Sequence, residues 1–297
     1  MDFLLLLQEL RTPIIEISAL FVSMLCNKIL LIAIFCYLFW CVNKEKAYGL
    51  AFTYIVSGIL VQGIKVFARV PRPFVRNPKI YPVDAAIETA TGYSFPSGHT
   101  QTATALLGYG AFSAKRVWLK ILAFIGIFSV MMSRMILGVH TPYDVIVSFF
   151  ITLVCVVFVA VFERRKINIS PKLVSLCGSV VSALLFAVTV IMILKDITTY
   201  TLAHDCLTAC ICSFAFFVCY YIETKFIKFD SACTFSGKQS LWEQLVKFII
   251  GLLVVIVIYV TFSLVDNVFV DGLKYALVFG WICGGYPFII RKKCKKV

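Results

Sequence analysis

The sequence predicts an all-α fold, a bundle of helices that crosses a lipid bilayer several times. Of its 297 residues, 61% are hydrophobic and only 14% are charged, and the mean hydropathy is +0.96. Soluble globular proteins are about 45–50% apolar and about 25% charged. The excess of apolar residues is too large for a bigger core, so we expect a polytopic membrane protein and no large soluble domain.

Apolar segments recur along the whole chain. A membrane helix needs about 20 mostly apolar residues, or fewer where flanking residues snorkel. The candidate spans are residues 29–42, 48–68, 98–114, 117–138, 143–162, 173–194, 203–222, 245–265 and 272–290. The first is short, and we expect residues 13–27, which include Glu16, to be re-entrant or interfacial. The N-terminal MDFLLLLQELRTP lacks the leader of a typical signal peptide and suits a short amphipathic helix on the membrane surface.

The basic residues predict the orientation of the spans. A net charge of +13 would suggest a nucleic-acid partner in a soluble protein. Here many basic residues lie in short clusters between apolar runs, which suits anionic lipid and topology control, so we expect no nucleic-acid partner. These clusters occupy alternate loops, at Lys44–Lys46, Lys115–Lys120, Arg164–Lys172, Lys225–Lys247 and Arg291–Lys296. The opposite loops, 195–202 and 266–271, contain only one basic residue, Lys195. Because basic residues favour the cytoplasmic side, we expect the clusters in the cytoplasm.

One outer segment breaks this pattern. Residues 69–79 carry Arg69, Arg72, Arg76 and Lys79 on the side where positive charge is disfavoured. Positive charge kept on that side needs a local reason, and a bound anion would supply one.

The 12 cysteines raise the question of disulfides or a metal site. No Cys-x-x-Cys pair occurs, and most cysteines, such as Cys36, Cys155 and Cys219, lie inside apolar runs. We therefore expect them to act as small hydrophobes. Carboxylates do not suggest a catalytic metal either, because Asp84 and Glu88 in the outer loop are too few.

The first of three polar motifs is KVFARVPRP, residues 65–73. Lys65 ends the second long span, and Pro71 disfavours helix for Val70, so the chain should leave the helix there. Arg72 then lies in the outer loop close to the membrane surface. Taken alone, Lys65 and Arg69 have a simpler explanation as snorkelling residues at a helix end.

The second motif is FPSGHT, residues 95–100. Ser97 is a natural N-cap, and the free N–H groups of Gly98 and His99 would then favour an anion at the start of the helix. Gly98 also permits close approach of the backbone. An ordinary helix start with an interfacial histidine explains this motif about equally well.

The third motif is SRMILGVHTPYD, residues 133–144. Thr141 and Pro142 suit an N-cap and first helical position, which makes Asp144 the acidic member of a capping box. Asp144 also follows His140 by four residues, so its carboxylate could bind the imidazole nitrogen that faces away from a substrate. Arg134 is harder to explain structurally, because a charge inside a span usually faces a polar partner or cavity.

The predicted orientation brings the three motifs to one level of the membrane. Spans two and four run outwards and span three starts from outside, so these residues share the outer face: Lys65, Arg72, Ser97, His99, Arg134, His140 and Asp144. The three cations can hold phosphate oxygens, and Ser97 and Gly98 add neutral donors. Two histidines can divide the duties of nucleophile and acid, while Asp144 fixes the tautomer of one of them.

These motifs resemble the type-2 phosphatidic acid phosphatase superfamily, which includes membrane lipid phosphatases, glucose-6-phosphatase and vanadium haloperoxidases. The family signature is lysine, six residues and Arg-Pro; then Pro-Ser-Gly-His; then Ser-Arg, five residues, histidine, three residues and aspartate. The sequence supplies Lys65 with Arg72-Pro73, Pro96-Ser97-Gly98-His99, and Ser133-Arg134 with His140 and Asp144, without departure in identity or spacing.

The resemblance implies a membrane helical bundle and hydrolysis of a phosphomonoester or pyrophosphate with no metal and no cofactor. By the family pattern, His140 attacks phosphorus to form a phosphohistidine, Asp144 orients His140, and His99 protonates the leaving oxygen. The residues that hold the phosphate oxygens would be Lys65, Arg72, Ser97, Gly98 and Arg134.

The resemblance also suggests how the chain is organised. We expect an N-terminal interfacial segment and first span in residues 1–44, a catalytic core in 45–165, and additional C-terminal transmembrane helices in 166–297. The extra helices would shape a lipid-access groove or an oligomer contact.

The leading hypothesis is a multi-pass phosphatase of the cell membrane with an extracytoplasmic active site, acting on a lipid phosphate or pyrophosphate. One alternative keeps the chemistry but uses a small soluble ester such as a sugar phosphate. Another is a non-catalytic lipid-phosphate binder or transporter, although binding alone would need only the cations and not His99, His140 and Asp144. A haloperoxidase is disfavoured in so hydrophobic a chain. The sequence leaves open the lipid, the oligomeric state and the compartment.

Overall fold

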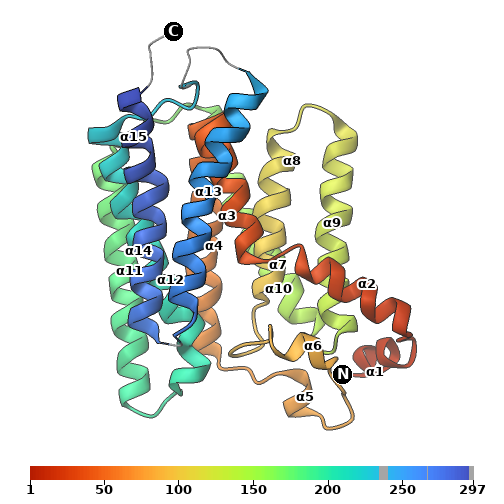
Figure 1. The fold of residues 1–297 in the computed structure, drawn as a ribbon. Coiled ribbons are helices and arrows are strands. Elements are labelled where there is room, and N and C mark those ends of the chain that lie inside the picture. The colour runs from red at the N-terminus through yellow and green to blue at the C-terminus, as the bar shows by residue number, and fades with distance from the viewer. Residues whose placement is uncertain (234–239, 266, 294–297) are drawn as a thin grey trace. The chain divides into compact units, whose positions relative to one another are not determined.

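The computed structural model describes residues 1–233, 240–265 and 267–293, and within these ranges it contains helices and no strands (Figure 1). This confirms the predicted all-α class. The α-helices are α1 (Asp2–Glu9), α2 (Pro13–Met24), α3 (Lys28–Tyr37), α4 (Lys44–Ala68), α5 (Pro73–Arg76), α6 (Asp84–Ile87), α7 (Gly98–Ala103), α8 (Tyr109–Ser113), α9 (Val117–Ile136), α10 (Pro142–Arg164), α11 (Pro171–Leu194), α12 (Tyr200–Ile222), α13 (Leu241–Ser263), α14 (Val268–Phe279) and α15 (Tyr286–Lys293). Short π-helical turns are η1 (Leu38–Val42), η2 (Thr104–Gly108), η3 (Glu223–Ile227) and η4 (Gly280–Gly285).

Within the described residues, 7 helices are long and apolar enough to cross a membrane. Two of the predicted spans differ from this set. Residues 29–42 form a pair with α2 that is bent by 44°, which makes an eighth, broken span or a re-entrant loop. Residues 98–113 form one helical run through α7, η2 and α8, which is shorter than the roughly 20 residues of a full span.

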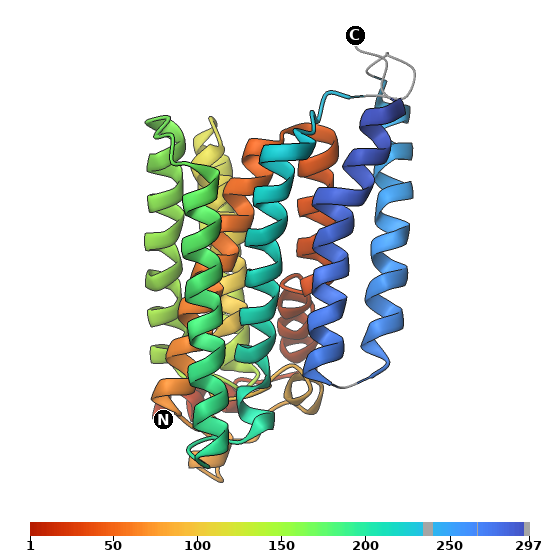
Figure 2. The same cartoon turned by 90° about the vertical axis from the view of Figure 1, so that its left-hand side faces the viewer.

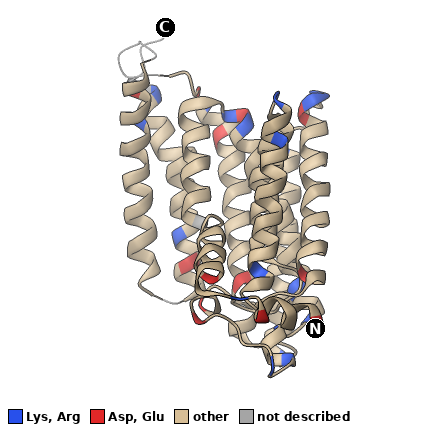
Figure 3. Ribbon diagram, turned by 90° about the vertical axis from the view of Figure 1, so that its right-hand side faces the viewer, with Lys and Arg blue, Asp and Glu red and all other residues tan. Residues whose placement is uncertain are grey.

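The charged residues lie mostly near the ends of the helices, and the middle of most helices carries none (Figure 3). This distribution fits helices whose central turns lie in hydrocarbon, where an ionised side chain is costly.

The chain divides into two compact units, each assembled from separate stretches of sequence. Unit 1 comprises Met1–Leu31, Phe52–Lys166 and Thr189–Cys206, and unit 2 comprises Ile32–Ala51, Ile167–Val188 and Leu207–Val297. The end of α11 and the start of α12 therefore belong with the three polar motifs in unit 1. The division at residues 44 and 165 follows the order of the chain, and it stays a prediction.

Apolar contacts in unit 1 hold the long loop between α4 and α7 against the ends of α9 and α10. Leu4 of α1 and Ile80 of the loop share one buried cluster with Met135 and Val145. Ala19 of α2 and Ala86 of α6 share another with Leu137 and Val139. The N-terminal residues do form a short helix, and one face of it contributes to this packing.

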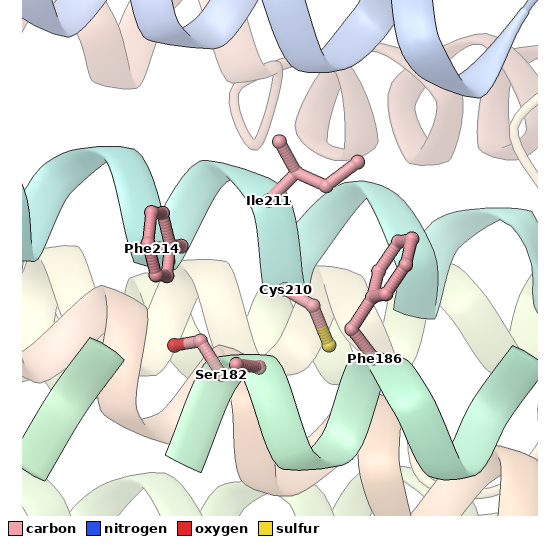
Figure 4. A pocket seen from close by; sticks show the side chains of 6 residues that line it. Ser182, Phe186, Cys210, Ile211 and Phe214 are labelled. Atoms are coloured by element: carbon pink, nitrogen blue, oxygen red, sulfur yellow. The ribbon is translucent and has the colours of Figure 1, made fainter. Parts of the chain in front are cut away.

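Unit 2 contains the antiparallel pair α13 and α14, which lie side by side in both views (Figures 1 and 2). A cavity of about 220 Å³ lies between α11 and α12 of this unit, lined by Ser182, Ala183, Phe186, Cys210, Ile211 and Phe214 (Figure 4). Neither a cation nor an imidazole lines it, so it offers nothing for phosphate chemistry.

Candidate active site

Three cations are buried at one end of unit 1. Lys65 lies in the last turn of α4, Arg72 is the N-cap residue of α5, and Arg134 lies in the last turn of α9. Their side chains are 3%, 5% and 0% exposed, respectively. Fully buried charges need partners, and these three are of one sign.

Arg72 is held between two loops. Its Nε donates to the carbonyl of Gly92 at 3.2 Å, and its Nη2 donates to the carbonyl of Thr91 at 2.7 Å. Its Nη1 donates to the carbonyl of Val139 at 3.1 Å and lies 2.9 Å from Nε2 of His140. The loop before α7 and the loop before α10 thus fix the guanidinium directly beside an imidazole.

The contact between Arg72 and His140 determines the tautomer of the imidazole. A guanidinium only donates, so Nε2 of His140 accepts and the proton of the neutral ring lies on Nδ1. Burial, and after it the charge of Arg72, hold the pKa of His140 well below its usual 6.5. The ring is therefore neutral near pH 7, with a lone pair on Nε2.

Asp144 serves both of the roles that its sequence position suggested. Its Oδ2 accepts from the backbone N–H of Thr141 at 2.6 Å, and the Thr141 side chain accepts from the Asp144 N–H, which completes a capping box. The same Oδ2 lies 3.6 Å from Nδ1 of His140. One carboxylate thus starts α10 and faces the protonated side of the imidazole.

The second motif begins α7 as predicted. The hydroxyl of Ser97 caps the helix by accepting from the N–H of Thr100, and the Ser97 N–H donates to the backbone carbonyl of Asp144 at 2.9 Å. Ser148 of α10 donates to the Ser97 carbonyl at 2.6 Å. These bonds fix the start of α7, and with it Gly98 and His99, beside the loop that carries His140.

His99 lies near the three buried cations and the other histidine of this group. Arg134, His140, Lys65 and Arg72 are close enough for their charges to act on its imidazole. Within the part of the chain that the structure describes, neither of its ring nitrogens has a hydrogen-bond partner, and the side chain is only half-buried. Its nitrogens are therefore free to meet a ligand.

Two buried cations also keep unused donors. Nη1 of Arg134 donates to the hydroxyl of Ser23 at 2.6 Å, but among the described residues Nε of Arg134 has no partner although it is buried. Lys65 is 3% exposed and has no ion-pair partner among the described residues. Buried donors usually have partners, so these two side chains are suited to bind an anion.

Two family models match the chain, the PAP2 superfamily over residues 46–168 and the PAP2 superfamily phosphatase transmembrane extension over residues 207–293. The chain belongs to the PAP2 superfamily. It is thus a membrane phosphatase of that family, as its three motifs suggested. A solved structure titled "Crystal structure of Aquifex aeolicus LpxE" is 24% identical, covers 53% of this chain and 92% of that chain, and has a TM-score of 0.46. No curated protein matched the chain.

The structure brings the predicted site residues of this PAP2 protein together, but not every nearby cation joins them. Arg69, Arg76 and Lys79 are exposed, and Nη1 of Arg69 donates to the carbonyl of Ile197 at 3.4 Å. Of the four basic residues in the segment 69–79, only Arg72 is buried with the site. The excess charge of the segment 69–79 is therefore not explained by this one group of buried residues.

Four polar residues around the PAP2 motifs were not identified from the sequence. Ser94 contacts both His140 and Asp144, and Ser23 and Thr89 contact Arg134. Asp205 of α12 accepts from the hydroxyl of Thr91 at 2.5 Å, and its charge acts on Lys65 and Arg72. Ser23 and Asp205 lie outside the matched core, so no local motif pointed to them.

The sequence also led to expectations about metal binding and about the role of the cysteines. The described residues include no group of three or more His, Cys, Asp or Glu side chains placed to hold a metal ion. Cysteines within the helices, Cys36, Cys155 and Cys219 among them, are free thiols, whereas Cys233 is disulfide-bonded.

Proposed function

We propose that this PAP2 protein hydrolyses a lipid phosphate or lipid pyrophosphate through a phosphohistidine at the extracytoplasmic face of the cell membrane. The observation that carries the proposal is the 2.9 Å contact between Arg72 Nη1 and His140 Nε2. It places the lone pair of a neutral imidazole beside the cation that would bind the phosphoryl group, and on binding the phosphorus would take the place of this N–H opposite Nε2.

In the first step Nε2 of His140 attacks phosphorus. The P–N bond forms while the bond from phosphorus to the leaving oxygen breaks. The bound anion offsets the cations that disfavour a charged His99, so His99 carries a proton in the complex and gives it to that oxygen. The imidazole becomes positively charged, and the carboxylate of Asp144 near Nδ1 offsets this charge.

In the second step water attacks the phosphohistidine. His99, now neutral, takes a proton from that water, the P–N bond breaks, and inorganic phosphate leaves. His140 returns to its neutral form and His99 to its protonated form, so the cycle closes without a net change in the protein.

Charge stabilisation supplies the rest of the proposed catalysis. Lys65, Arg72 and Arg134 neutralise the phosphoryl oxygens, while the Ser97 hydroxyl and the Gly98 N–H donate to them. This anion would satisfy the buried Nε of Arg134 and would pair with the amino group of the buried Lys65. With three cations in place, the reaction needs no metal ion.

The test is release of phosphate by the purified protein in detergent with EDTA. We expect turnover of a long-chain lipid phosphate or diphosphate, and far slower turnover of a sugar phosphate. A preference for the sugar phosphate would favour the soluble-ester alternative, and binding without any turnover would favour a transporter. Activity that vanishes with EDTA and returns with a divalent ion would contradict the metal-free mechanism.

The proposed orientation has its own test. Lys79 is exposed in the outer loop, so a cysteine introduced by Lys79→Cys should react with a membrane-impermeant maleimide on intact cells. The unmodified chain, with its own cysteines, serves as the background control. Labelling that occurs only after permeabilisation would place the site on the cytoplasmic side.

A further inference from the structure

Ser94 lies at the junction of the proposed nucleophile and its carboxylate. Its side chain is 0% exposed. Its Oγ lies 2.6 Å from Oδ2 of Asp144 and 3.5 Å from Nδ1 of His140. The direct distance between Nδ1 of His140 and Oδ2 of Asp144 is 3.6 Å, which is long for a hydrogen bond. A hydroxyl therefore sits beside the gap between the two residues.

The donors and acceptors in this group determine the direction of each bond. An ionised carboxylate only accepts, so the single hydroxyl proton of Ser94 goes to Asp144. Nδ1 of His140 carries a proton, because Nε2 accepts from Arg72. Two acceptors lie at similar distances from Nδ1, Ser94 Oγ at 3.5 Å and Asp144 Oδ2 at 3.6 Å, and the hydroxyl of Ser94 is bonded to that same Oδ2. A hydrogen-bonded path is thus available from His140 through Ser94 to Asp144.

The backbone fixes Ser94 in this position. Its N–H donates to the carbonyl of Val70 at 2.8 Å, in the segment that leads from α4 to Arg72. Two residues earlier, Gly92 has a φ of +62°, and a Cβ there would lie 2.9 Å from the carbonyl oxygen of Leu202. Because a side chain at position 92 would be strained, this glycine allows the loop to pass close to α12 before it reaches Ser94.

We infer that Ser94 is a positioning residue whose hydroxyl links Nδ1 of His140 to the carboxylate of Asp144 and so orients the nucleophile. The inference rests on the proposed function, because it assigns a role within the same reaction. Ser94 touches neither phosphorus nor the leaving group. It acts by holding His140 in the tautomer that exposes Nε2, and by passing the stabilising effect of Asp144 to the imidazolium.

A purely structural role is the competing explanation. On that view the hydroxyl only tethers Asp144 to the loop before α7, much as Ser148 tethers the carbonyl of Ser97. Loss of a tether would loosen the whole pocket and raise KM together with the inhibition constant of inorganic phosphate. If Ser94 instead links His140 to Asp144, its loss would lower kcat and shift the acid limb of kcat/KM, while the inhibition constant of inorganic phosphate would stay unchanged.

The experiment compares Ser94→Ala with Ser94→Cys and Ser94→Thr in detergent, using a lipid phosphate as substrate and inorganic phosphate as competitive inhibitor. Losing one hydrogen bond to a group that becomes charged should lower kcat roughly 10- to 100-fold in Ser94→Ala. KM and the inhibition constant should stay within about twofold, and Ser94→Thr, which keeps a hydroxyl, should recover most of kcat.

The pH profile gives the second readout. With one acceptor fewer beside Nδ1, His140 binds a proton less tightly, so the acid limb of kcat/KM in Ser94→Ala should move down by about 0.5–1 pH unit. Ser182→Ala is the matched control, because Ser182 is 1% exposed and donates to the Gly178 carbonyl at 2.7 Å within unit 2, whereas both imidazoles belong to unit 1. Its acid limb should stay unchanged.

The outcomes separate the two proposals. Unchanged kcat and pH profile in Ser94→Ala, or a raised KM at constant kcat, would overturn the role of Ser94. If Ser94→Ala does not fold, Ser94→Cys decides, since a thiol of similar size is a weak donor and should still lower kcat. If His140→Ala keeps full activity, the phosphohistidine mechanism itself is wrong, whatever the Ser94 variants do.

Discussion

Each of the two units buries a cluster of charged residues, and the clusters differ in how the charges are balanced. In unit 2, Glu223 is 0% exposed and is fully paired. It accepts from Nζ of Lys44 at 3.1 Å, from the hydroxyl of Tyr48 at 2.8 Å and from the N–H of Phe229 at 2.8 Å. One buried carboxylate thus meets one cation and two neutral donors.

Unit 1 buries three cations against the carboxylate of Asp144, with Asp205 half-buried nearby. Among the described residues, the buried Nε of Arg134 has no hydrogen-bond partner, and Lys65 is 3% exposed without an ion pair. Burial of unpaired charge is costly, and an excess of one sign persists where a ligand of the other sign completes the set. We therefore interpret the balanced cluster in unit 2 as structural and the unbalanced one as the proposed binding site.

The largest expected effect comes from removing the proposed nucleophile. His140→Ala should lower phosphate release by at least about 10³-fold, because no other group can form the P–N bond. Cys155→Ala is the control, a buried residue of α10 that makes no contact with the phosphate-binding cations, and it should lose little activity. Full turnover by His140→Ala would contradict the mechanism.

A cation in the unbalanced cluster should affect chemistry, whereas a carboxylate in the balanced cluster should affect stability. Arg134→Ala should lower kcat/KM by about 10²–10³-fold, since it removes a charge from the developing phosphoryl oxygens. Glu223→Gln should lower the thermal midpoint in detergent while kcat stays within about twofold. Equal catalytic losses in both variants would remove the distinction between the clusters.

The pH dependence sharpens the same comparison. Burial and Arg72 hold the pKa of His140 below 6.5, so the neutral nucleophile persists as the pH falls through that value. The acid limb of kcat/KM should therefore lie below pH 6.5. Arg72→Gln removes one cause of the shift, so its acid limb should move to higher pH, in addition to a lower rate. An acid limb that moves down in Arg72→Gln would contradict this account.

The sequence predicted which residues of the candidate site lie together more accurately than it predicted the lengths of the spans. The motifs around Lys65, His99 and His140 have fixed spacing, and helix ends place such residues by local rules of capping and proline geometry. The run 98–113 was harder to interpret, because hydropathy alone does not reveal that it is shorter than a full span and contains a π-turn at Thr104–Gly108. Hydropathy along the chain shows where apolar residues lie, but it does not show where a helix is interrupted.

Contacts between distant segments were beyond local rules. Ser23 holds Arg134 and Asp205 holds Thr91, yet the members of each pair are separated by more than a hundred residues. Ser23 and Asp205 belong to none of the three sequence motifs, so the pattern of the sequence gives no reason to assign them a role. Only the packing of α2 and α12 within unit 1 shows that they meet the site.

Asp205 provides the smallest and most specific test of the charge argument. Its side chain is half-buried, and its charge acts on Lys65 and Arg72. Asp205→Asn keeps an acceptor for Thr91 but removes the negative charge, so the pocket becomes more positive. Because a half-exposed charge is screened by water and salt, inorganic phosphate should bind only about two- to fivefold more tightly.

Thr91→Val is the control for Asp205, since it breaks the same hydrogen bond without changing the charge of the pocket. If charge is the cause, the gain in phosphate affinity should appear in Asp205→Asn alone and shrink as salt is added. Weaker phosphate binding in both variants would show that the bond from Thr91 to Asp205 shapes the pocket mechanically. The carboxylate of Asp205 would then have a structural role, like that of Glu223 in unit 2. The excess of positive charge in unit 1 would no longer explain how phosphate binds.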